Sequence, residues 1–178
     1  MNITVRPATS DDADFLAAGN AAMALETEHK RLDPDTVGAG VHAALADPGK
    51  GRYFVAERDG RRVGQLMFTY EWSDWRNGTF WWIQSVYVRQ EYRQRGVFRA
   101  LYRHVRALAR SRDGVYGLRL YVEHENRRAQ DTYRALAASG IPAEGFGALE
   151  QLLRAYWPEV GAVARGDLPA TVGEARRL

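Results

Sequence analysis

One segment, residues 86–101, limits the possible folds of this chain more than any other. Val86, Tyr87 and Val88 are β-branched or aromatic and predict the end of a strand, and a basic loop follows them. The loop ends at Gly96, where the apolar spacing of an amphipathic helix begins. The first backbone N–H groups of a helix have no partner within it, and the helix dipole adds positive potential there. The segment therefore predicts a sheet that brings a helix N-terminus to an anion such as a pyrophosphate.

The remaining patterns predict an α/β fold, a mixed sheet with helices on both faces. Strands are expected over residues 2–6, 53–57, 63–70, 80–88 and 115–122. Helices are expected from Ser10 as N-cap to about residue 30, and over residues 34–46, 96–112 and 126–138. Hairpin signals at Asp59-Gly60 and Asn77-Gly78 make the three middle strands an antiparallel meander. The helix between strands 80–88 and 115–122 makes these two strands parallel neighbours.

Length and composition indicate one domain. The chain has 178 residues, and 46% of them are apolar, enough for one core. We expect this domain over residues 1–157, with residues 141–157 fitting a strand or a short helix equally well. Residues 158–178 have weak periodicity and predict a loosely attached tail.

Several classes of chemistry are excluded by residue type. The chain has no cysteine, which excludes disulfides, thiolate metal ligands and a cysteine nucleophile. Its four histidines lack the spacing of metal ligands, so no metal is expected. No secretory signal and no apolar run of membrane-spanning length occur, so we expect a soluble cytoplasmic protein without membrane contact.

Charge is distributed unevenly along the chain. Residues 1–50 carry four Lys or Arg against eight Asp or Glu, whereas residues 86–134 carry twelve Arg against five Asp or Glu. The basic half suggests a polyanionic partner, either a phosphorylated cofactor or a nucleic acid. No groove-reading motif accompanies the arginines, so we expect no nucleic-acid partner.

Two motifs together indicate a family. The loop at residues 93–98 reads Arg-Gln-Arg-Gly-Val-Phe, and Asn126, Ala129 and Tyr133 recur at i, i+3 and i+7 on one face of the predicted helix. Within the predicted order of strands and helices, these two motifs resemble those of the GCN5-related N-acetyltransferase superfamily, and the resemblance covers roughly residues 2–152. That family carries a small residue at the sixth loop position, where this chain has Phe98. Its side chain is therefore expected to turn away into the core.

The resemblance implies an acetyl-CoA-dependent N-acetyltransferase that acts on a small, cationic amine by direct attack on the thioester. It implies cofactor contacts from the strand end, the loop and the helix start: Val86, Tyr87, Val88, Arg93, Gln94, Arg95, Gly96, Val97, Phe98 and Arg99. It also implies that Asn126 contacts the pantetheine arm and that Tyr133 lies near the sulfur as general acid. The alternative is a non-catalytic acyl-CoA-binding module on the same fold.

An acidic and indole-rich segment suggests where the amine binds. Glu71 and Asp74 flank Trp72 and Trp75, and carboxylates beside indoles bind cationic amines through charge and cation–π contact. Glu71 is the expected base. The alternative is a hairpin in which Asp74 is a turn residue and the indoles pack on the sheet.

Three further residues are candidates for the acceptor site. Glu26 and Glu28 end the first predicted helix, which in the family borders this site, and they are the second candidates for the base. Gln84 stands where the polyamine-acetylating branch has a glutamate, and it cannot serve as a base or neutralise a cation. The aromatic run Phe80-Trp81-Trp82 is compatible with a buried surface or a homodimer interface.

Overall fold

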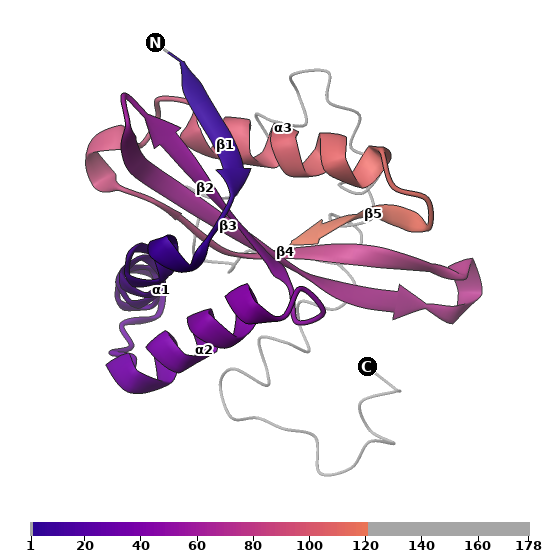
Figure 1. Ribbon diagram of the computed structural model, residues 1–178, viewed down its shortest axis with the longest axis horizontal. Helices are drawn as coiled ribbons and strands as arrows, with labels where there is room; N and C mark the ends of the chain where they lie inside the picture. Colours follow the sequence, from indigo (N-terminus) through magenta and orange to yellow (C-terminus); the bar gives the residue numbers. More distant parts are fainter. Residues whose placement is uncertain (1, 121–178) are drawn as a thin grey trace, which may run out of the picture.

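The computed structural model describes residues 2–120, which form a five-stranded sheet in the order β1-β2-β3-β4-β5 (Figure 1). The elements in chain order are β1 (Ile3–Pro7), α1 (Ala13–Glu28), α2 (Pro34–Ala46), β2 (Arg52–Arg58), β3 (Arg61–Ser73), β4 (Gly78–Val88), α3 (Val97–Arg110) and β5 (Val115–Leu120). Strands β1 to β4 pair antiparallel, and β4 pairs parallel with β5. The predicted mixed sheet, its meander and its parallel pair are therefore confirmed.

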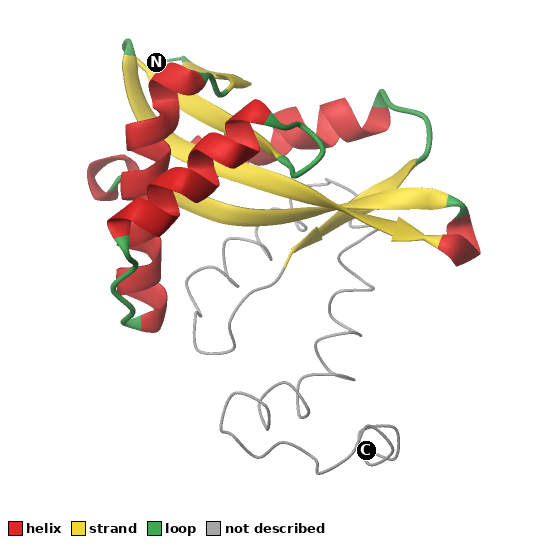
Figure 2. Cartoon of the chain, turned by 60° about the horizontal axis from the view of Figure 1, so that its bottom comes forward, coloured by secondary structure: helices red, strands yellow, loops and turns green. Residues whose placement is uncertain are grey.

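Helices cover both faces of the sheet. Helices α1 and α2 lie on one face and α3 lies on the other (Figures 1 and 2). Strand β2 shows why: Tyr53 and Val55 pack toward α1 and α2, whereas Phe54 and Ala56 pack toward α3. A strand buried on both faces has a continuous apolar sequence, and residues 53–56 of β2 form such a sequence.

The start of the first helix differs from the prediction. Ser10 begins a short 3₁₀ turn (Ser10–Asp12), and α1 begins only at Ala13. The cause is Asp12, whose carboxylate accepts hydrogen bonds from the N–H of Thr9 at 2.8 Å and from its hydroxyl at 3.3 Å. Thr9, and not Ser10, is therefore the residue that caps this turn.

Asp12 also joins three elements of the fold. It is fully buried and pairs with Arg6 of β1 at 2.7 Å and with Arg62 of β3 at 2.8 Å. Burial is the largest single influence and acts to raise the pKa of its carboxyl group, but the hydrogen bonds from Arg6 and Thr9 and the charges of Arg6 and Arg62 together outweigh it and lower the pKa from 3.8 to about 2. Arg6 extends this network to Glu57 of β2 at 2.6 Å.

Some predictions fall outside the described residues. These are the helix over 126–138 with Asn126 and Tyr133, the end of the strand at 121–122, the segment 141–157 and the tail over 158–178. Within residues 2–120, no helix is both long and apolar enough to cross a membrane.

Candidate functional site

The loop between β4 and α3 ends in two residues with left-handed backbone, on either side of Arg95. Gln94 has φ of 60° and Gly96 has φ of 82°, and Gly96 is the N-cap of α3. The hydrogen bonds of the helix begin with the Ala100 N–H, which donates to the Gly96 carbonyl at 3.0 Å. The N–H groups of the first turn, at residues 97–99, therefore have no partner within the helix. They form an anion-binding N-terminus that no acidic side chain of the first turn neutralises.

The arginines of this loop fall into two groups. Arg93 is fixed in place, since its Nε donates to the Val88 carbonyl at 2.8 Å and its Nη2 pairs with Glu26 at 2.6 Å. Arg95 and Arg99 are exposed, and neither pairs with a carboxylate in the part of the chain that the structure describes. The loop thus has one arginine that holds its shape and two that an anion can recruit.

The start of α3 is held close to the sheet. A Cβ on Gly64 would lie 2.8 Å from the Val97 side chain and 3.1 Å from the Tyr87 carbonyl, so only glycine fits there without displacing the helix. Phe98 is partly buried against the core on the α3 side, with its ring centroid 6.2 Å from that of Tyr102. Its bulk therefore points away from the loop.

A β-bulge lies in β4 just before the loop. Gln65 pairs with Tyr87 and Met67 pairs with Gln84, so Ser85 and Val86 together face one residue of β3. Ser85 has left-handed backbone, with φ of 51°. A bulge leaves one residue out of the ladder and turns the strand locally. The bulge thus leaves one residue at Ser85–Val86 outside the β3–β4 ladder, and the described pairing of β4 with β5 ends at Ile83.

A charged and aromatic cluster lies on the face of the sheet that carries α1 and α2. We call Glu71, Phe80, Trp82 and Arg119 the Arg119 cluster. Arg119 pairs with Glu71 at 2.5 Å and lies 3.8 Å from the centre of the Phe80 ring. The Trp82 indole N–H donates to the other oxygen of Glu71. The pair bridges β3 and β5 across β4, and all four residues are partly exposed.

Gln84 lies on the same face, two residues further along β4. Its Nε2 donates to the Thr69 hydroxyl at 2.7 Å, and its side chain is exposed. Gln84 therefore lies between the Arg119 cluster and the bulge at Ser85. Along β4 toward its C-terminal end, this face therefore carries the Arg119–Glu71 ion pair, then the amide of Gln84, and then the bulge at Ser85.

The other candidates for the acceptor site are not gathered at one place. Trp72 is 64% exposed on the opposite face from Glu71, because neighbouring residues of a strand point to opposite sides. Trp75 is 90% exposed, and with Asp74 it lies in the turn between β3 and β4. The expected grouping of Glu71 with these two indoles is wrong. The indole that contacts Glu71 is Trp82.

The two glutamates of α1 also differ in role. Glu26 contacts the loop, accepting from Arg93 at 2.6 Å and from Gln90 at 3.5 Å. Glu28 is exposed and pairs with Lys30 at 2.7 Å. Only Glu26 is therefore part of the structure around the loop.

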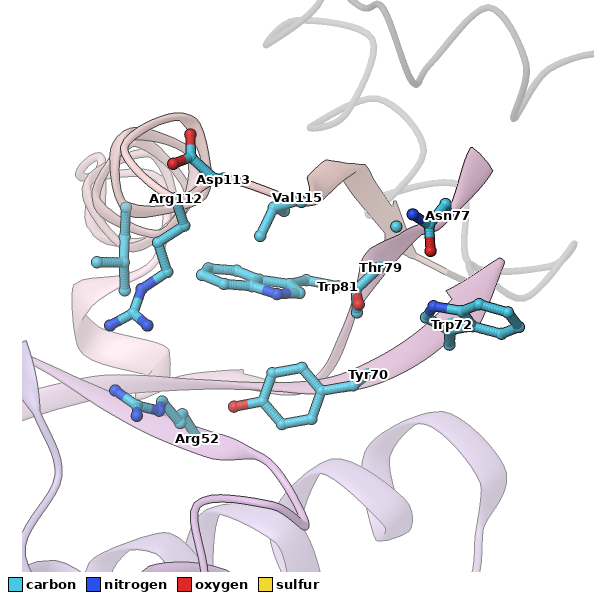
Figure 3. A pocket seen from close by; sticks show the side chains of 12 residues that line it. Arg52, Tyr70, Trp72, Asn77, Thr79, Trp81, Arg112, Asp113 and Val115 are labelled. Carbon is cyan, nitrogen blue, oxygen red and sulfur yellow. The ribbon is translucent and has the colours of Figure 1, made fainter. Parts of the chain in front are cut away.

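A cavity of about 480 Å³ lies at the opposite end of α3. Its walls come from the β3–β4 hairpin, Arg52, and the turn between α3 and β5, with Tyr70, Trp72 and Trp81 as its aromatic lining (Figure 3). At 1.5 Å per residue, the length of α3 separates it from the loop by about 20 Å. It contains neither loop residues nor the Arg119 cluster, so it is separate from the candidate site. Among the described residues, no group of three His, Asp or Glu side chains could hold a metal ion.

Comparisons with known proteins agree with this layout. The family model described as "Acetyltransferase (GNAT) family" matches residues 21–137, a range that includes Asn126 and Tyr133. The thialysine N-epsilon-acetyltransferase of Bos taurus is 34% identical over 85 residues, which are 47% of this chain and 49% of that protein. The chain thus matches about half the length of this curated relative.

Solved structures extend the similarity to the fold. A possible acetyltransferase from Clostridium difficile 630 is 47% identical, covers 76% of this chain and 90% of its own, and superimposes with a TM-score of 0.71. A predicted acetyltransferase from Clostridium acetobutylicum, solved with acetyl-CoA, is 14% identical, with coverage of 74% and 88% and a TM-score of 0.60. The second likeness concerns the fold alone.

Proposed function

The chain belongs to the acetyltransferase (GNAT) family, and from this premise we propose that it transfers an acetyl group from acetyl-CoA to the amine of a small molecule. The observation that supports the cofactor is the N-terminus of α3. It presents the N–H groups of its first turn, which have no partner within the helix, beside Arg95 and Arg99. A Cβ on Gly96 would meet nothing within 4 Å, so the loop leaves room for a phosphate group.

Each residue of the loop then has a distinct part in binding. We assign the pyrophosphate to the N–H groups of residues 97–99 and to the side chains of Arg95 and Arg99. Arg93 and Glu26 hold the loop in the shape that presents these donors. We propose that Asn126 contacts the pantetheine arm and that Tyr133 is the general acid, as the family resemblance implies. Both residues lie outside the described part of the chain.

The chemistry requires a neutral amine at the end of β4. Bound acetyl-CoA supplies the thioester that this amine attacks. We propose that a backbone N–H among Val86, Tyr87 and Val88 stabilises the developing oxyanion, because these residues follow the bulge and lie beyond the described pairing of β4 with β5, which ends at Ile83. Both oxygens of Glu71 are already engaged, by Arg119 and by Trp82. Glu71 is opposite Phe80, five positions and about 16 Å before Ser85 at 3.3 Å per residue, so we propose that the amine loses its proton to water and not to Glu71.

The acceptor is proposed to be a small primary amine. The name of the bovine relative describes acetylation of the side-chain amine of thialysine, an amine of this kind. The assay is an amine panel with acetyl-CoA, read by mass spectrometry. Transfer to a panel member, lowered in Tyr133→Phe, supports the proposal, and tight acetyl-CoA binding without transfer to any amine contradicts it.

A second candidate is the non-catalytic acyl-CoA-binding module. One observation favours it: on the Arg119 face, the carboxylate of Glu71 is neutralised by an arginine. The same amine panel separates the two, since a binding module binds acetyl-CoA but gives no acetylated product.

The cofactor site has its own test. Arg95→Gln removes an exposed cation beside the helix N-terminus, and we expect acetyl-CoA affinity to fall roughly 3- to 10-fold by isothermal titration. Arg103→Gln is the matched control, because Arg103 is exposed on the same helix beyond its first turn. Equal affinities of the two variants would contradict the assignment of Arg95.

A further inference from the structure

The Arg119–Glu71 pair has unused hydrogen-bonding capacity on an open face. Arg119 uses Nη1 for Glu71, and its Nε and Nη2 donate to no atom of the described residues. Its guanidinium carbon lies 3.8 Å from the centre of the Phe80 ring, and the residue opposite Phe80 on β5 is Gly117, which has no side chain. A carboxylate has about four acceptor sites, so Glu71 can still accept after binding Arg119 and Trp82. Among residues 2–120 the pair is therefore fixed in place and keeps hydrogen-bonding groups without a partner.

This arrangement suits a ligand that carries a carboxylate and an ammonium group side by side. A planar guanidinium edge matches a carboxylate, and a carboxylate beside it matches an ammonium. A diamine would bring a second cation close to Arg119, where only Glu71 would compensate it. Gln84, between the pair and the bulge, adds no negative charge. This face of the sheet thus favours an acceptor that carries a carboxylate as well as an amine over one that carries only amines.

The spacing along β4 fits an extended amino acid. Phe80, beneath the guanidinium, precedes the bulge residue Ser85 by five positions, about 16 Å at 3.3 Å per residue. A hydrogen bond at one end and the reacting contact at the other each take about 3 Å. About 10 Å remains for the acceptor, close to the reach of a lysine-like chain of about six bonds of ~1.5 Å and its end groups.

We propose that the acceptor is an amino acid with an amine at the end of its side chain. Arg119 binds its α-carboxylate, Glu71 binds its α-ammonium, and the distal amine extends past Gln84 to the end of β4. Both residues are positioning and specificity residues, and neither touches the reacting atoms. The inference rests on the proposed acetyltransferase function and names the substrate class of that same site.

The test uses matched acceptors with the full-length protein and acetyl-CoA. Lysine is compared with cadaverine and ornithine with putrescine, since each diamine lacks only the carboxyl group of its partner. We expect kcat/KM at least tenfold higher for the amino acid of each pair. Arg119→Gln should lower kcat/KM about tenfold or more for the amino acids and should raise it for the diamines, because the repulsion of their second cation is removed. Arg112→Gln, an exposed arginine at the far end of α3, is the control and should keep the wild-type preference.

The ratio within each pair separates recognition from general damage. A variant that is merely unstable loses activity on both members equally, which would contradict the role of Arg119. Glu71→Gln should raise KM for the amino acids and leave the pH profile of kcat unchanged, whereas loss of a base would change that profile.

The outcomes also separate this inference from the proposed function. Equal kcat/KM within both pairs, or acetylation of other amines but of neither pair, overturns the inference and leaves the acetyltransferase intact. Absence of acetylated product with every amine overturns the proposed function itself.

Discussion

At the scale of single residues, Gly64 determines how closely α3 approaches the sheet. Gly64→Ala places a methyl group 2.8 Å from the Val97 side chain and 3.1 Å from the Tyr87 carbonyl. We expect a loss of about 1–3 kcal/mol in the free energy of unfolding, because the helix must shift. Acetyl-CoA affinity should fall as well, since the shift occurs at the anion-binding end of α3. Urea denaturation and titration calorimetry measure the two effects.

The matched control for this change is Gly38→Ala. Gly38 lies within α2, and a Cβ there meets nothing within 4 Å. Alanine in a helix interior is favoured over glycine, so this variant should gain about 0.5–1 kcal/mol and bind acetyl-CoA as wild type does. Destabilisation of both variants would show that the close approach at Gly64 is not the cause.

Residue-level prediction from the sequence succeeded for local features and failed for pairs distant in the chain. The loop glycine and the core-facing Phe98 follow from the residues of the loop itself. The partners of Glu71 do not, because Trp82 and Arg119 reach it only after β3, β4 and β5 align. Strand alternation alone would have separated Glu71 from Trp72. Locating Arg119 needs the register of the parallel pair.

At the scale of elements, Asp12 links β1, the first 3₁₀ turn and β3. Its pKa is lowered from 3.8 to about 2 in the folded protein, so the folded state binds its proton less readily than the unfolded chain. This contribution is present in full above about pH 4 and is lost as pH falls toward 2. We expect a loss on the order of 1–2 kcal/mol over that window, measured by urea denaturation from pH 5 to pH 2.

Substitution identifies the group responsible. Asp12→Asn should flatten the acid limb of the stability profile and destabilise the protein at pH 7 by about 3 kcal/mol, because Arg6 and Arg62 lose their buried partner. Asp11→Asn, at the exposed neighbouring position, should change neither quantity. An unchanged acid limb in Asp12→Asn would assign the effect to other carboxylates.

Element boundaries were predictable where burial is one-sided. Helix α3 runs close to its expected limits because its apolar stripe is clear. Strands β3 and β4 extend beyond the prediction, since their outermost pairs, such as Trp72 with Thr79, have no consistent apolar alternation. The beginning of α1 was misplaced because the carboxylate of Asp12 binds Thr9 and is itself held by Arg62 of β3, which is remote from it in sequence.

At the scale of the whole molecule, the Glu26–Arg93 pair joins the two layers on either side of the sheet. Glu26 belongs to α1, and Arg93 belongs to the loop that begins α3. We expect Glu26→Gln to weaken acetyl-CoA binding a few-fold and to change the stability of the ligand-free protein by less than about 1 kcal/mol. Ligand-dependent thermal shifts measure both, because a saturating ligand at 100 times its Kd stabilises by about 2.7 kcal/mol.

The control is Glu28→Gln two residues away. Glu28 pairs with Lys30 and does not contact the loop, so its loss should leave the thermal shift unchanged. A smaller shift in both variants would point to a general effect of charge at the end of α1 and against a specific link between the layers.

The bridge from Glu71 to Arg119 also has a consequence for how the sheet opens. It joins β3 to β5 across β4. Strand β5 is therefore held by its backbone hydrogen bonds to β4 and also by a side-chain ion pair to β3. Local opening of the parallel pair must break both. Backbone amides of β5 should therefore exchange with deuterium more slowly than the ladder alone would allow. In Arg119→Gln they should exchange faster, while amides of β1 and β2 keep their protection.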